Sequence, residues 1–225
     1  MATLKQGKKF LGLIEEISDE QLQNLFGSGL LTDLLECPSP DLVDRKEFQR
    51  VLALAITKPK PILDLVSTVT IPARTTKFVA KDHFVVNTSG EAKVKISYLG
   101  DNFRKHFLGK TEEPTSETTF RCHKLKKLSR DIRIINKLGG EERAETTLSA
   151  MFALMEKQPN GEKGALLNNG YANIFYIRDA AGVLWAVYCC WRDDGWYVSV
   201  DSVGNPGEWL DGFQVFSRNS SETKN

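Results

Sequence analysis

The last third of the chain constrains the fold most, because its apolar segments are separated by hairpin-length turn sequences. Strands are predicted at residues 171–177, 183–191 and 196–200, with turns that contain aspartate and end in glycine at 179–182 and 192–195. The middle segment is apolar on both faces, which indicates an interior strand of a sheet. With a fourth short strand at 213–216, this region is expected to form an antiparallel β-meander.

One main helix is expected to pack on this sheet. Apolar residues recur at three- and four-residue steps before the terminating Pro-Asn-Gly of 159–161, which is typical of one helix face. These residues are Ala144, Leu148, Met151, Phe152 and Met155. Further strands are predicted at 66–71, 78–86, 92–98 and 118–125, and a short helix at 101–108. Strands, a helix and then hairpin-linked strands predict an α+β fold with an antiparallel sheet.

The first 57 residues are predicted to form a separate helical region. Proline residues at 59 and 61 cannot continue a helix, because proline lacks the N–H donor and forces the preceding residue toward extended geometry. The predicted organisation is a helical N-terminal region (1–57), a proline-containing linker and extended segment (58–74), an antiparallel α+β domain (75–219) and a polar tail (220–225).

Composition excludes several classes of protein. The 225 residues carry 30 Lys or Arg and 29 Asp or Glu, a net charge of +1, so the chain is neither a polybasic nor an acidic disordered protein. No apolar run approaches the roughly 20 residues that span a bilayer. The four cysteines are irregularly spaced in a chain long enough to bury a core without disulfides. We expect a soluble, cytoplasmic protein.

Positive charge is concentrated between residues 104 and 137, which contain ten Lys or Arg and four Asp or Glu. If residues 127–138 are helical, Leu128, Ile132 and Ile135 face inward and the cations face outward. The predicted function is therefore weak, sequence-independent binding of RNA or DNA through residues 121–137. The residues of this predicted basic site are Lys124, Lys126, Lys127, Arg130 and Arg133. The alternative is that these cations pair with acids of the N-terminal helices, such as Glu15, Glu16, Asp33 and Glu36.

Aromatic residues suggest a second binding surface. All four tryptophans lie between Trp185 and Trp209, and Trp185 and Trp191 are six residues apart on one strand, so they share a face. Trp196 opens the next strand. These tryptophans either fill the core of the sheet or expose a face for a peptide, a sugar or stacked bases. Trp185, Trp191 and Trp196 are the predicted ligand-binding residues.

No complete catalytic, metal or cofactor motif is present. Gly109-Lys110-Thr111 resembles the end of a phosphate-binding loop, but Arg104 occupies the position of its first glycine. Cys122 and His123 are neighbours on a strand and project to opposite faces. Zinc binding by His106, Cys122 and His123 lacks ligand spacing. We predict a binding protein without cofactor or metal; the alternative is a hydrolytic enzyme that uses Cys122 with a distant histidine, His83 or His106.

Several short segments carry a resemblance across residues 20–219. They are LLTDLL (30–35), KFVAK (77–81), KISYLGDNF (95–103), FLGK (107–110), EEP (112–114), LGGE (138–141), NGYANIFY (169–176) and VFSRN (215–219). In these segments the chain resembles a family of uncharacterised proteins predicted from genomes of uncultured, small-genome bacteria of the candidate phyla. The resemblance implies a cytosolic bacterial protein and assigns no activity. Trp185 stands where members of that family often have arginine.

Overall fold

The computed structural model describes residues 27, 36, 61–205 and 207–219. The chain divides into two compact units, Met1–Lys60 and Pro61–Asn225. Apart from Gly27 and Glu36, the predicted helices of residues 1–57 lie outside the described residues, as does the polar tail of 220–225.

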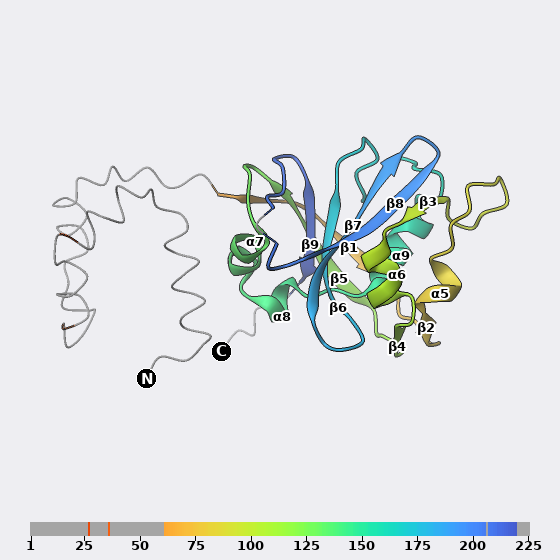
Figure 1. The fold of residues 1–225 in the computed structure, drawn as a ribbon, viewed down its shortest axis with the longest axis horizontal. Coiled ribbons are helices and arrows are strands. Elements are labelled where there is room, and N and C mark those ends of the chain that lie inside the picture. Colours follow the sequence, from red (N-terminus) through yellow and green to blue (C-terminus); the bar gives the residue numbers. More distant parts are fainter. Residues whose placement is uncertain (1–26, 28–35, 37–60, 206, 220–225) are drawn as a thin grey trace. The chain divides into compact units, whose positions relative to one another are not determined.

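Seven strands of the second unit form one sheet, in the order β1-β5-β9-β6-β7-β8-β3 (Figure 1). Their bounds are β1 (Leu63–Ile71), β3 (Ile96–Leu99), β5 (Thr118–Leu125), β6 (Asn173–Arg178), β7 (Leu184–Arg192), β8 (Gly195–Ser202) and β9 (Gln214–Arg218). A separate two-stranded sheet pairs β2 (Phe78–Val79) with β4 (Thr111–Glu112). The extended segment predicted at 66–71 is part of β1, which pairs with β5 along its length.

The prediction of an α+β fold is confirmed, but the prediction of an antiparallel sheet is wrong. The meander β6-β7-β8 is antiparallel as expected, whereas β9 lies parallel to β6 and β3 lies parallel to β8. Turn sequences specify the pairing only of strands that are joined by a hairpin, and they give no information on how β9 or β3 pairs. The segment between β8 and β9 is too long to be a hairpin, and it carries the chain back to the middle of the sheet, between β5 and β6.

Five described helices cover the two faces of the sheet. They are α5 (Ala80–His83), α6 (Asp101–Phe107), α7 (Asp131–Leu138), α8 (Glu141–Ala144) and α9 (Leu148–Glu156). Figure 1 shows α7 and α8 on one side of the sheet and α5, α6 and α9 on the other. We call these the α7 face and the α9 face. No helix in the described part of the chain is long and apolar enough to cross a membrane.

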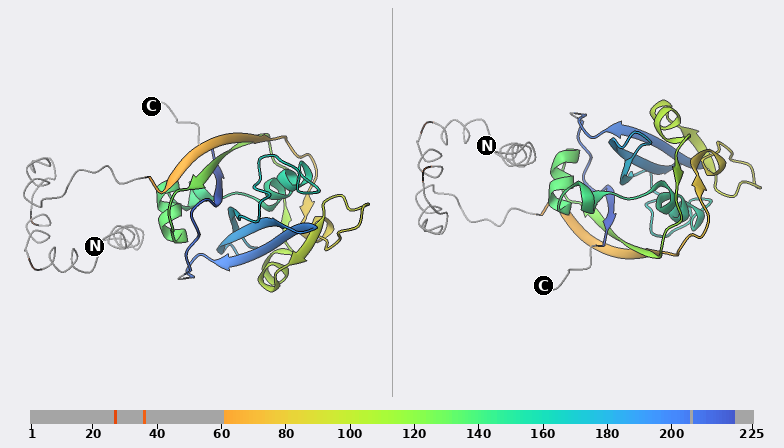
Figure 2. Two further views of the ribbon diagram at one scale, coloured as in Figure 1. Left: turned by 90° about the horizontal axis from the view of Figure 1, so that it is seen from above. Right: turned by 90° about the horizontal axis from the view of Figure 1, so that it is seen from below.

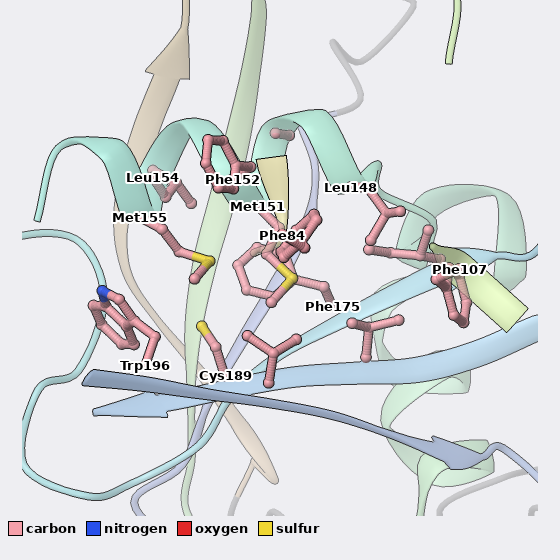
Figure 3. Close-up of a cluster of buried hydrophobic side chains, with 14 of the residues drawn as sticks. Phe84, Phe107, Leu148, Met151, Phe152, Leu154, Met155, Phe175, Cys189 and Trp196 are labelled. Atoms are coloured by element: carbon pink, nitrogen blue, oxygen red, sulfur yellow. The ribbon is translucent and has the colours of Figure 1, made fainter. Parts of the chain in front are cut away.

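The larger core lies on the α9 face. Figure 2 shows β1 and β5 curving around α9, and in Figure 3 Met151 and Met155 of that helix point toward Cys189 and Trp196 of the sheet. All four side chains are buried. Phe103 and Phe107, predicted to be the buried residues of a short helix, are fully buried in this core from α6.

The single helix predicted to carry Ala144 and Met155 on one face is two helices. Ala144 ends α8 and packs on the α7 face, whereas α9 begins at Leu148 and packs on the other face. Glu145 is extended and Thr146 donates its N–H to the carbonyl of Tyr176, so the chain passes from one face of the sheet to the other beside the interior strand β6. The Thr147 hydroxyl then caps α9 by accepting from the N–H of Ala150.

Of the inward stripe predicted for residues 127–138, only Ile135 is buried. The helix α7 begins at Asp131, and its buried apolar residues are Ile134 and Ile135. Leu128 is 51% exposed and Ile132 is 39% exposed. Leu128 lies before the helix and so has no place on its faces, and the buried face of α7 is formed by Asp131, Ile134 and Ile135, which leaves Ile132 toward solvent.

Candidate nucleic-acid interface

The predicted tryptophans lie on the α9 face and contribute to its core. Trp196 is fully buried and donates its indole N–H to the carbonyl of Gln158 at 3.0 Å. The ring of Trp191 packs edge-on against Trp196 and covers Gly161, whose φ of +71° favours glycine. Trp185 is half-buried, donates to Asp179 at 3.0 Å and packs against His106. These three tryptophans therefore mainly pack in the core: Trp196 is fully buried, and Trp185 and Trp191 are half-buried.

The predicted basic residues lie on a strand, in a loop and on a helix. Lys124 is exposed near the end of β5, where side chains alternate between the two faces of the sheet. Lys126, Lys127 and Arg130 follow in the loop between β5 and α7, and Arg133 lies half-buried on α7. We call residues 126–130 the basic loop.

Backbone hydrogen bonds and an ion pair hold the basic loop beside Trp209. Ser129 and Trp209 exchange two backbone hydrogen bonds, of 3.1 and 2.9 Å, and Arg130 forms an ion pair with Glu208 at 3.9 Å. At the other end of the loop, the N–H of Lys126 donates to the carbonyl of Ile62 at 2.9 Å. These contacts hold the backbone of the loop next to an aromatic side chain.

Trp209 belongs to a continuous row of six aromatic rings. Successive ring centroids are separated by 4.5, 6.5, 5.3, 6.1 and 5.5 Å. The rings, in spatial order, are Tyr98, Tyr197, Tyr188, Trp209, Phe213 and Tyr171. We call them the aromatic row. It starts at the edge strand β3, crosses β8 and β7, and continues over the segments that precede β9 and β6.

Strand parity separates this row from the three core tryptophans. On β7, Tyr188 points to the opposite face from Trp185 and Trp191, and on β8 Tyr197 points away from Trp196. Tyr98 reaches the same face as Tyr197 because the pairing of β3 with β8 shifts register between Ile96 and Tyr98. Ile96 is fully buried on the α9 face, whereas Tyr98 is 41% exposed.

One end of the row combines stacked rings with a cation. The rings of Tyr98 and Tyr197 stack at an interplanar angle of 15°, and the guanidinium of Arg192 lies 4.4 Å from the centroid of the Tyr197 ring. Arg192 is exposed at the end of β7. The other end of the row, Tyr171, is 44% exposed. The two ends of the row therefore offer aromatic surface to solvent.

A buried carboxylate fixes the middle of the row. Asp131 accepts hydrogen bonds from the indole N–H of Trp209 at 2.6 Å and from the hydroxyl of Tyr176 at 2.8 Å. Burial, with a smaller contribution from the charge of Asp201, raises the pKa of Asp131 to about 6, although the hydrogen bonds from Trp209 and Tyr176 lower it. Both donors contact the same oxygen of Asp131. The buried carboxylate therefore fixes the orientation of the Trp209 ring.

The surroundings of Cys122 are those of a structural cysteine. Its side chain is 1% exposed, and burial raises its pKa to about 11, whereas a nucleophilic cysteine needs a lowered pKa. The partners of its thiol are Ser67 and Gln214. His123 lies on the opposite face, 3.2 Å from the hydroxyl of Ser217, and burial lowers its pKa to about 4. Neither residue is arranged for nucleophilic catalysis.

His106, one of the two histidines named as a distant partner for Cys122, lies beside an acid. Its Nδ1 is 3.5 Å from Asp179, which also accepts N–H groups of Ala181 and Val183 and the indole N–H of Trp185. This network closes the turn between β6 and β7, so Asp179 has a complete structural role. Within the described ranges no group of three or more His, Cys, Asp or Glu side chains is arranged to hold a metal ion.

Comparison of the chain with protein-family models, curated proteins and solved structures finds no match. The functional assignment therefore depends on the geometry of the aromatic row and the basic loop.

Proposed function

We propose that this protein binds single-stranded nucleic acid across the aromatic row, without strong sequence preference. The observation that carries the proposal is the contact between the predicted basic residues and the aromatic row, because the basic loop is hydrogen-bonded to Trp209 in the middle of the row. Sheet surfaces that present aromatic rings bind single strands by stacking on bases, and nearby cations neutralise the phosphates.

Each end of the row contributes differently to the proposed binding. At the β3 end, the exposed ring of Tyr98 provides a stacking surface that is supported from behind by Tyr197. Arg192, next to Tyr197, supplies a cation for the phosphate backbone of the nucleic acid. At Trp209, the exposed Lys126 and Arg130 with the half-buried Lys127 supply three more, although Glu208 offsets part of the charge of Arg130. Stacking accepts any base, so this arrangement favours sequence-independent binding.

The test of stacking is fluorescence anisotropy with labelled single-stranded oligonucleotides, such as oligo-U and oligo-dT, at low salt. Tyr98→Ala should weaken binding by about 5- to 100-fold, since stacking on one ring contributes about 1–3 kcal/mol per base. Tyr98→Phe is the matched control, because it keeps the ring and should bind nearly as the unmodified protein does. Equal affinity of the alanine and phenylalanine variants would disprove a stacking role for Tyr98.

Salt dependence tests the cationic component. Four phosphate contacts, one each from Lys126, Lys127, Arg130 and Arg192, predict a slope of log affinity against log salt of about −3. Replacing the first three residues with glutamate should abolish most of the binding, whereas glutamate at the exposed Lys77, Lys81 and Lys105, near the α9 face, should not. If the cations instead dock the N-terminal region, the first variant should release residues 1–60 to proteases, with oligonucleotide affinity unchanged.

Neutral polysaccharides are the other class of ligand that aromatic surfaces bind. The basic loop favours the nucleic acid, because a neutral sugar polymer gains nothing from the adjoining cations. Salt-independent retention on a neutral polysaccharide, together with no retention of oligonucleotides at low salt, would reject the proposed function.

A further inference from the structure

A cleft of about 450 Å³ opens on the α9 side of the sheet, away from the aromatic row. It lies between α9, the segment that follows β1 and the segment that precedes β5. From its lining we infer that the cleft binds a small phosphorylated ligand whose body carries several hydroxyl groups, in the manner of a sugar phosphate. The volume falls in the range of about 300–1,000 Å³ that is usual for small-molecule sites.

The cleft exists because small side chains of α9 face it. Ala150 and Ala153 are three residues apart and share one face of the helix. Opposite them, Ile71 and Phe120 of the sheet form an apolar floor and are themselves buried. A larger side chain at 150 or 153 would occupy the space, so the two alanines keep the cavity open.

Arginine side chains supply the positive charge of the lining. The guanidinium of Arg74 lies 4.6 Å from the centroid of the Phe78 ring, and this cation–π contact orients it. Arg218 also lines the cleft, and its Nε donates to the carbonyl of Glu145 at 2.8 Å. A planar guanidinium presents several parallel N–H donors, which match the oxygens of a phosphate group.

The rim around Arg74 is held in place by backbone pairing. The N–H of Arg74 donates to the carbonyl of Thr115 at 2.8 Å, and the N–H of Thr115 donates back at 3.0 Å. These two bonds join the segment after β1 to the segment before β5. The cleft therefore has a preformed wall, which reduces the entropy that a ligand must overcome on binding.

Hydroxyl groups make up most of the remaining polar lining. Seven of the lining residues are threonine or serine: Thr75, Thr76, Thr115, Ser116, Thr118, Thr147 and Ser149. A hydroxyl both donates and accepts, so such a wall suits the hydroxyl groups of a polyol. Glu156, which forms an ion pair with Lys93 at 2.5 Å, adds a carboxylate that can accept from a ligand hydroxyl.

The proposed site is independent of nucleic-acid binding. Its residues come from the α9 face and from the segments that flank β1 and β5, whereas the aromatic row lies on the α7 face. Tyr98→Ala should therefore leave it unchanged, and failure of one proposal does not imply failure of the other.

The experiment is a titration of the full chain, followed by protein NMR, with glucose 6-phosphate, ribose 5-phosphate, glucose and inorganic phosphate. We expect a sugar phosphate to bind saturably, at least tenfold more tightly than glucose or inorganic phosphate. Ala153→Leu, which fills the cleft, should abolish the binding, whereas Ala153→Ser keeps the volume and should retain it. Arg74→Gln should weaken sugar-phosphate binding at least tenfold. Because Arg74 lies on a surface segment, this variant should fold normally, and it therefore tests the site even if Ala153→Leu fails to fold.

Three results would overturn the inference. The first is that neither sugar phosphate binds saturably up to roughly 10 mM, a limit that corresponds to about −3 kcal/mol. The second is that inorganic phosphate or glucose alone binds as tightly as the sugar phosphates. The third is that folded Ala153→Leu and Arg74→Gln proteins, verified by circular dichroism, bind as the unmodified protein does.

Discussion

Replacing Asp131 with asparagine should remove a pH-dependent cost from the free energy of folding. Burial raises the pKa of this carboxyl from its ordinary 3.8 to about 6 in the folded protein. Between these two values the folded state holds a proton that the unfolded state releases, so stability falls as the pH rises. One pKa unit corresponds to 1.36 kcal/mol, so ionisation of Asp131 costs about 3 kcal/mol by pH 7.

The asparagine variant stays neutral at every pH. Its side-chain oxygen can still accept from Tyr176 and Trp209, as one oxygen of Asp131 does. The difference in unfolding free energy, variant minus unmodified protein, should therefore rise by about 3 kcal/mol between pH 3.5 and pH 7 and then stay level.

Urea denaturation followed by tryptophan fluorescence, at half-unit steps of pH, measures this difference. Comparison within the pair cancels the other titrating groups that the two proteins share. A difference that does not change with pH would refute the reasoning, because it would show that the folded protein does not hold Asp131 away from water.

Three further predictions follow from buried groups. Val187→Asp should abolish the cooperative unfolding transition in circular dichroism, because Val187 is fully buried in β7 and an unpaired buried carboxylate costs several kcal/mol; an unchanged melting temperature would contradict its position. Glu112→Ala should lower the unfolding free energy by about 2–3 kcal/mol in urea, since the Glu112 carboxylate accepts the first two N–H groups of α9 at 2.9 Å each; a loss below 0.5 kcal/mol, the low end for a single hydrogen bond, would contradict the cap. Iodoacetamide should alkylate the buried Cys122, Cys189 and Cys190 only after denaturation, as measured by mass spectrometry. Rapid labelling of these cysteines in the native protein would contradict their burial.

The sequence predicted what local patterns can specify. The meander β6-β7-β8 follows from its turn residues, and α6 and α9 follow from the spacing of their apolar residues. The position of β9 between β5 and β6 does not follow, because no turn sequence encodes a pairing across a long connection. The helix α7 begins four residues after the predicted start for a related reason, since its first residue, Asp131, is held by contacts with Tyr176 and Trp209 that are distant in sequence.

The aromatic row is not among the predicted surfaces, although strand alternation implies part of it. The parity that groups Trp185 with Trp191 also sends Tyr188 to the opposite face, and this signal was available in the sequence. Tyr98 was not predictable in this way. Alternation from Ile96 places it on the buried face, and only the register shift in β3 turns it outward.

Photocrosslinking tests the proposed interface most directly. The full chain is irradiated with a single-stranded RNA that contains 4-thiouridine, and the crosslinked peptides are identified by mass spectrometry. Crosslinks are predicted in the peptides that contain Tyr98, Tyr197 or Tyr171 and in those of the basic loop, and they should disappear with excess unlabelled oligonucleotide. Crosslinks confined to α6, α9 or other parts of the α9 face, or none at low salt, would contradict single-strand binding on the aromatic row.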